Sequence, residues 1–168
     1  RARFADGELV LLRDQDRTLW DHAAIAEGER LIERAAALRR PGRYQLQAAI
    51  AAVHATGSSW AETDWLQISL LYDELARHDA SPVVRLNQVV AHAQVVGPVD
   101  ALARLETLAD ALEDYHLFHA TRAELLTAVG RDEEAGAANR RALELTSNDA
   151  ERRLLTTRLR RRRLDDGS

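Results

Sequence analysis

The sequence predicts an all-α fold: a right-handed superhelix of about eight helices in antiparallel pairs, preceded by a short extended arm. Apolar residues recur three and four positions apart through most of the chain, as they do along one face of a helix. Isolated glycines and prolines divide this pattern into segments of helical length. One stretch, residues 115–145, places two such segments on either side of a single glycine, and looser copies of the same arrangement precede it.

That stretch, YHLFHATRAELLTAVGRDEEAGAANRRALEL, predicts two helices joined by a tight turn. Gly130 ends the first helix, where a left-handed backbone conformation costs glycine least. Asp132 stands where the N-cap of the second helix is expected. Ala135 and Ala142 are seven residues apart on the second helix. Both are small, as required where two helix backbones approach closely.

The spacing resembles the tetratricopeptide repeat, with Gly130 in the turn and Ala135 and Ala142 at the close-packing positions. Asn139 departs from the pattern, which has a large aromatic residue there, and Ser147 replaces the closing proline. Gly97 lies 33 residues before Gly130, near the 34-residue period of the repeat, and Gly57 marks a third, looser unit. Hairpins of this kind complete one another's cores by stacking.

Residues 1–16 are expected to form an extended arm or linker with a turn at Asp6-Gly7, and residues 17–168 one tetratricopeptide-like domain. Start and stop signals place the helices as follows: from Arg17 to the Pro41-Gly42 stop, 44 to about 55, 64 to 75, 82 to 96, 98 to about 112, 115 to 129, 132 to 145, and a last helix capped by Ser147 or Asn148.

Composition narrows the classes of function. The net charge of −4 gives no general attraction to nucleic acid, and the absence of cysteine excludes disulfides and thiolate metal sites. No apolar run approaches the roughly 20 residues of a membrane span, and no signal peptide is visible. We therefore expect a cytoplasmic protein without membrane contact. Because the chain opens on Arg1 and has no methionine, we expect a piece of a longer protein.

The sequence contains no recognisable pattern of catalytic or metal-binding residues. His116 and His119 share a helix face, but no third ligand or HExxH motif accompanies them, so packing or a hydrogen bond is favoured over a metal. His54 and His92 are interpreted as satisfied core histidines. No GxSxG motif or phosphate-binding glycine loop occurs. The sequence therefore indicates no enzyme and assigns no catalytic, cofactor or metal residue. The basic run Arg160 to Arg163 is interpreted as a solvated helix end.

A binding groove is the remaining candidate. Polar or aromatic residues interrupt otherwise apolar helices at eight positions: Tyr44, Gln47, Asp64, Trp65, Asn87, Tyr115, His119 and Arg122. An asparagine such as Asn87 suits the main-chain amides of a bound peptide, because its side chain both donates and accepts hydrogen bonds. The alternative is that these groups cap loops and join neighbouring hairpins.

Several stretches together resemble one family: DGELVLLRDQDRTLWD, AEG, YQLQAAIAAVHA, TDW followed by LYDEL, SPVVRLN and YHLFHATRAELL. The chain is similar to the C-terminal tetratricopeptide-like extension of bacterial extracytoplasmic-function sigma factors of RNA polymerase. The similarity covers nearly the whole chain. Arg43, Gln88 and Asn139 depart from it.

The resemblance implies two upstream sigma domains, absent from this chain, that bind promoter DNA and polymerase. The chain itself would regulate transcription initiation by contacting those domains or RNA polymerase, without touching nucleic acid directly. A second hypothesis is a small-molecule-sensing helical domain that controls the sigma factor, with a pocket near His54, Trp65 and Tyr72. The sequence specifies neither the signal, the ligand, the binding surface nor the oligomeric state.

Overall fold

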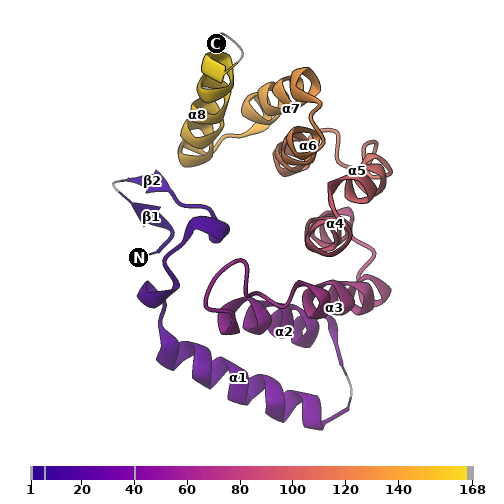
Figure 1. Cartoon of the computed structure of the whole chain (residues 1–168). Helices are drawn as coiled ribbons and strands as arrows, with labels where there is room; N and C mark the ends of the chain where they lie inside the picture. Colours follow the sequence, from indigo (N-terminus) through magenta and orange to yellow (C-terminus); the bar gives the residue numbers. More distant parts are fainter. Residues whose placement is uncertain (1, 6, 40, 166–168) are drawn as a thin grey trace. The chain divides into compact units, whose positions relative to one another are not determined.

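The computed structural model describes residues 2–5, 7–39 and 41–165, with the backbone alone for residues 158 and 160–165. Two short strands, β1 (Phe4–Ala5) and β2 (Glu8–Leu9), form a sheet, and 3-10 turns follow at Leu12–Asp14 and Arg17–Leu19. The described chain then forms eight α-helices (Figure 1): α1 (His22–Ala37), α2 (Arg43–Thr56), α3 (Trp65–His78), α4 (Pro82–Val96), α5 (Pro98–Glu106), α6 (His116–Ala128), α7 (Asp132–Leu145) and α8 (Asp149–Asp165). The predicted all-α class and helix number are confirmed.

Two compact units make up the chain. Unit 1 comprises residues 1–5 and 10–95, and unit 2 comprises residues 6–9 and 96–168. The right-handed superhelix expected of the whole chain stays a prediction. Within the described residues, no helix is both long enough and apolar enough to cross a membrane.

The core of unit 1 is formed by α2, α3 and α4. Their buried side chains recur at helical spacing and form one cluster: Leu46, Ile50, Val53, Ile68, Leu75, Val84 and Ala91. Trp65, Leu71 and Tyr72 pack against it from partly buried positions. Helix α1 contacts α2, but none of its side chains is buried, and Leu38, directly after its last residue, is 70% exposed. The apolar stripe of α1 is therefore only half covered within unit 1.

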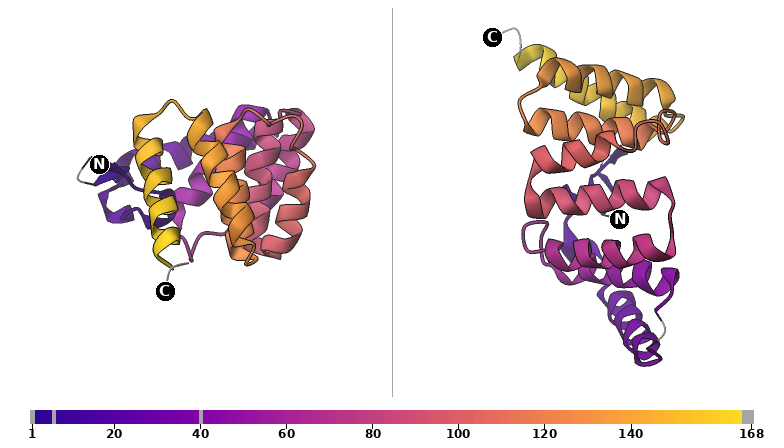
Figure 2. Two further views of the ribbon diagram at one scale, coloured as in Figure 1. Left: turned by 90° about the horizontal axis from the view of Figure 1, so that it is seen from above. Right: turned by 90° about the vertical axis from the view of Figure 1, so that its right-hand side faces the viewer.

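The core of unit 2 depends on the close approach of α6 and α7 (Figure 2). Ala135 and Ala142 have no exposed surface, and Phe118 and Leu126 of α6 are almost completely buried. Gly130 adopts a φ of 75° between the helices, and the following Arg131 N–H donates to Leu126 O at 2.9 Å. The predicted glycine turn and the two small close-packing positions are confirmed.

Three predicted boundaries were wrong. The first helix begins at His22 rather than Arg17, because Asp21 caps it by accepting a hydrogen bond from Ala24 N. Helix α5 ends at Glu106 rather than near residue 112, since Thr107 and the next two residues form tighter i→i−3 backbone bonds. Asp132 is the first residue of α7, not its N-cap.

The N-terminal arm is extended, as predicted. Its two short strands pair as a hairpin, and 3-10 turns follow. Asp6 of the expected turn lies outside the described residues, while Gly7 has the left-handed φ of 80° that such a turn requires. The last helix follows one of its two expected caps, because Asn148 Oδ1 accepts from Ala150 N at 2.9 Å. The side chains of the basic run at residues 160–163 lie outside the described part of α8.

Asn139 occupies the inner face of α7, at the position where the repeat pattern has an aromatic residue. It is only 4% exposed, and its Oδ1 atom has no hydrogen-bond partner among the described residues. A buried, unsatisfied carbonyl costs free energy, on the order of 1–3 kcal/mol. Asparagine in place of an aromatic residue therefore leaves a buried oxygen unsatisfied on the packed face of α7.

The contact between α6 and α7 predicts that Ala142→Leu lowers the free energy of unfolding by about 1–3 kcal/mol, because a buried position without free space is overpacked. The matched control is Ala137→Leu, on the exposed face of the same helix, which should change stability by less than about 0.5 kcal/mol. Urea denaturation followed by circular dichroism measures both. Equal effects of the two substitutions would contradict close packing at Ala142.

Candidate functional site

The most constrained polar site in unit 1 surrounds Arg17. Its side chain is 7% exposed, and its Nη1 atom donates to His54 O at 2.8 Å and to Gly57 O at 2.6 Å. Its Nη2 atom donates to Thr63 Oγ1 at 3.1 Å. The carbonyls lie at the C-terminal end of α2, where the helix dipole places partial negative charge. One guanidinium thus ties the N-terminal segment to the end of α2 and to the residue before the N-cap of α3.

Gly57 is required by this arrangement. A Cβ atom on it would lie 3.0 Å from the Cα of Thr63, 3.1 Å from Glu62 O and 3.1 Å from Arg17 Nη1. Two of these three neighbours are backbone atoms, which cannot move aside cheaply. The loop between α2 and α3 therefore closes around the guanidinium only because residue 57 has no side chain.

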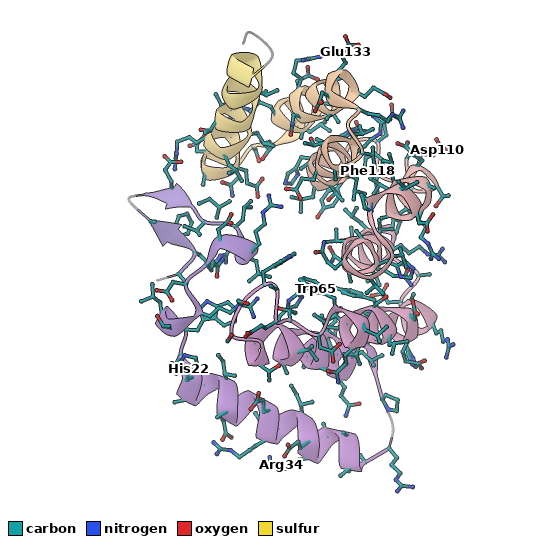
Figure 3. All side chains as sticks on the ribbon, in the orientation of Figure 1. His22, Arg34, Trp65, Asp110, Phe118 and Glu133 are labelled. Atoms are coloured by element: carbon teal, nitrogen blue, oxygen red, sulfur yellow. The ribbon has the colours of Figure 1, made fainter. Side chains whose placement is uncertain are left out.

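Aromatic rings extend the site. Trp65 donates from Nε1 to Trp60 O at 3.0 Å, and the two ring centres are 4.3 Å apart. Trp60 reaches α4, with its Nε1 3.3 Å from Gln94 Oε1. Trp20 lies on the other side, its ring centre 5.1 Å from the guanidinium carbon of Arg17, a cation–π distance. The three tryptophans of the chain thus surround one locus, and Figure 3 marks Trp65 within it.

His54 lies between the arginine and these rings. Its ring packs edge-on against Trp65 at 5.2 Å, and its buried Nδ1 atom has no hydrogen-bond partner among the described residues. Burial, and next the nearby charge of Arg17, lower the pKa of His54 below its ordinary value of 6.5. The interpretation of His54 as a satisfied core histidine was wrong. It fits His92, whose Nδ1 lies 3.0 Å from the buried Ser69 Oγ.

Five of the eight predicted groove residues belong to unit 1. Asp64 is the N-cap of α3 and accepts from Gln67 N at 2.9 Å, and Trp65 packs against the core. Tyr44 is 70% exposed and its hydroxyl accepts from Arg43. Gln47 and Asn87 are exposed, and neither side chain makes a hydrogen bond among the described residues. Asp64 and Trp65 thus serve the local structure, while the two amides face solvent.

The other three belong to unit 2. His119 Nε2 lies 2.7 Å from Glu113 O, so its ring is hydrogen-bonded to the loop before α6. Arg122 Nε donates to Glu106 Oε1 at 2.8 Å and joins α6 to α5. Tyr115 precedes α6 as its half-buried N-cap residue. The alternative that such groups cap loops and join helices therefore describes His119 and Arg122.

His116 and His119 point to different partners. His116 Nε2 lies 2.9 Å from Glu151 Oε2, at ion-pair distance, and the same oxygen accepts from Thr146 Oγ1 at 2.7 Å. Over the described residues, no three histidine, aspartate or glutamate side chains gather as a metal site would require. His116 Nε2 thus faces a carboxylate of α8 but makes no hydrogen bond among the described residues.

A cavity of about 640 Å³ opens in unit 1, lined chiefly by the N-terminal segment and the start of α1. Its walls include Leu19, Trp20, Ile25 and the polar Arg3 and Gln15. The sequence places a ligand pocket elsewhere, near His54, Trp65 and Tyr72, where the last two rings pack against the core. Sequence reasoning missed Arg17 as well, because one arginine among 23 carries no local signal of burial.

Two comparisons relate the chain to known proteins. A family of unknown function, DUF6596, matches residues 1–36. Over 152 residues the chain is 48% identical to an uncharacterized protein of Rhizobium meliloti (strain 1021), a match that covers 90% of this chain and 36% of that protein. The chain therefore spans about a third of the length of the curated relative it matches. No solved structure matches the chain.

The Arg17 site predicts that Arg17→Met lowers the free energy of unfolding by about 2–3 kcal/mol, because two carbonyls and a hydroxyl lose their donor. Arg34→Met is the matched control, since Arg34 is exposed on α1 (Figure 3). Urea denaturation followed by tryptophan fluorescence measures both variants. A loss at Arg17 no larger than the loss at Arg34 would show that the buried guanidinium stabilises little.

The lowered pKa of His54 predicts a pH dependence of stability. Well above pH 6.5 the ring is neutral in both states and has no effect on the pH dependence of stability. As the pH falls through 6.5, the unfolded chain binds the proton more tightly than the folded chain, so stability is lost. His54→Gln should flatten this slope, whereas His22→Gln, at an exposed position, should keep it. Thermal melts from about pH 7.5 to about pH 5.5 cover the window. An unchanged slope in His54→Gln would refute the assignment.

Proposed function

We propose that this chain is a regulatory protein-binding module of an extracytoplasmic-function sigma factor. It modulates transcription initiation by contacting the sigma domains or RNA polymerase. The carrying observation is that the side-chain amides of Gln47 and Asn87 are exposed on α2 and α4 and make no side-chain hydrogen bond among the described residues. Amide side chains of this kind bind peptide groups of a partner through paired donors and acceptors.

Three further observations support the proposal. The stretches that resemble the sigma-factor extension run from residue 6 into α6, and the confirmed helical hairpin of α6 and α7 completes them. Leu66 and Leu70, one turn apart on α3, are 58% and 59% exposed and add apolar surface. The relative from Rhizobium meliloti extends well beyond the match, which covers 36% of it, and so has room for further domains.

The alternative, a small-molecule-sensing domain, is favoured by the cavity beside Trp20. Its volume of about 640 Å³ falls in the range of small-ligand sites. A ligand held there would raise the melting temperature of the chain on its own. A protein-binding module gains stability only when its partner is present.

The proposed function predicts that the two upstream sigma domains, added as a separate protein, bind this chain. Gln47→Ala combined with Asn87→Ala should weaken that binding about tenfold, the effect of losing one or two hydrogen bonds. Gln67→Ala removes an equally exposed amide from α3 and serves as the matched control. Isothermal titration calorimetry measures all three. Absence of binding by the unaltered chain at about 100 μM would refute the proposal.

A further inference from the structure

Helix α8 is positively charged, whereas the rest of the chain is negatively charged. It carries seven of the 23 arginines and three of the 27 acidic residues, a net charge of +4, so the rest of the chain carries −8. Such an asymmetry within one chain is typical of an element that meets acidic groups. In unit 2 the helix already contacts an acidic residue, Glu8, because strand β2 lies against it.

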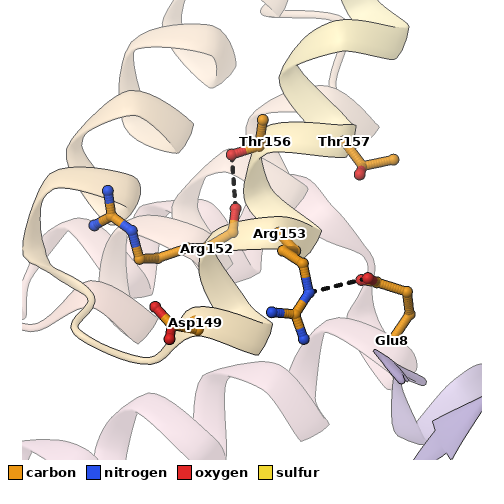
Figure 4. Close-up of a pocket in the computed structure, with 6 residues that line it drawn as sticks. All are labelled: Glu8, Asp149, Arg152, Arg153, Thr156 and Thr157. Atoms are coloured by element: carbon orange, nitrogen blue, oxygen red, sulfur yellow. Dashed lines mark hydrogen bonds and ion pairs between the residues drawn. The ribbon is translucent and has the colours of Figure 1, made fainter. Parts of the chain in front are cut away.

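Arg153 holds that strand in two places. Its Nε atom donates to Glu8 Oε1 at 2.9 Å (Figure 4). Its Nη2 atom donates to Gly7 O at 3.1 Å. One planar guanidinium thus binds both a side-chain carboxylate and the main-chain carbonyl of the residue before it. The group recognised is an acidic residue within an extended peptide.

The surroundings leave room for more than Glu8. A cavity of about 430 Å³ is lined by Glu8 and, from α8, by Asp149, Arg152, Arg153, Thr156 and Thr157. Arg152 donates to the carbonyls of Leu143 and Thr146 and fixes the start of α8 to the end of α7. Its neighbour Arg153 is therefore the residue that receives the occupant, on a helix held in place by other contacts.

The contact with Glu8 is weak enough to be exchanged. The side chains of Arg153 and Glu8 are 49% and 57% exposed, and a pair so open to water contributes about 0–1 kcal/mol. We propose that the α8 cavity is a docking site for an acidic, extended segment of a partner protein, and that Glu8 occupies it in cis until that segment competes. This inference rests on the geometry of unit 2 and does not depend on the sigma-factor assignment.

The test uses the full chain and a fluorescein-labelled peptide, ARFADGELVLL, with the sequence of residues 2–12. We expect weak binding by the unaltered chain and up to about fivefold tighter binding by Glu8→Gln, which frees Arg153. Adding Arg153→Gln to that variant should remove this gain and weaken binding by up to about fivefold. Adding Arg104→Gln instead, a matched charge change at an exposed position of α5, should leave binding unchanged. Fluorescence anisotropy gives the affinities, and circular dichroism checks that each variant is folded.

Three outcomes would overturn the proposal. Glu8→Gln could bind the peptide no more tightly than the unaltered chain, which would show that Glu8 does not occupy the site. A peptide with glutamine in place of its glutamate could bind equally well, which would remove the role of the carboxylate. A DNA duplex could displace the peptide at lower concentration than unlabelled peptide does, which would make α8 a nucleic-acid surface instead.

Discussion

Unit 1 depends on the burial of a positive charge that has no carboxylate beside it among its described contacts. Removing a guanidinium from water is costly, and Arg17 offsets this cost with two carbonyls, one hydroxyl and the face of Trp20. Because these acceptors come from separate segments, the hydrogen bonds form only when α2, the following turn and the residue before α3 are all in place. The same requirement explains Gly57, whose missing Cβ lets the turn close.

Unit 2 depends instead on the short distance between the backbones of α6 and α7. Ala135 and Ala142 are fully buried because α6 and α7 approach too closely for larger side chains. Asn139, on the same face, is buried with an unsatisfied oxygen, a cost that the surrounding apolar contacts must exceed. Helix α8 is then attached through polar contacts at its first turn, including the Thr146 and Glu151 pair and the carbonyls bound by Arg152.

The sequence predicted those features whose causes are local. Gly130 and Asn148 act within one turn of their own position, so the residue type alone indicates their role. The end of α5 was missed because a switch to i→i−3 bonding at Thr107 leaves no strong residue signal. The Arg17 site was missed for a different reason: its acceptors are mainly backbone carbonyls about 40 residues away, and main-chain groups look alike in every sequence. The amides Gln47 and Asn87 were predicted as binding residues because polar residues stand out in apolar helices, and that role stays a prediction.

Degree of burial separates the polar groups that hold the fold from those suited to recognition. Arg17 is buried, so breaking its contacts would leave several groups unsatisfied, and exchange with a partner is too costly. Arg153 makes contacts of similar length, but water surrounds both partners, so replacing one carboxylate by another changes the free energy little. The side chains of Gln47 and Asn87 are exposed and make no hydrogen bond among the described residues that binding would have to break. The two proposed binding sites, the exposed amides and the solvated Arg153, therefore lie where binding would not compete with folding.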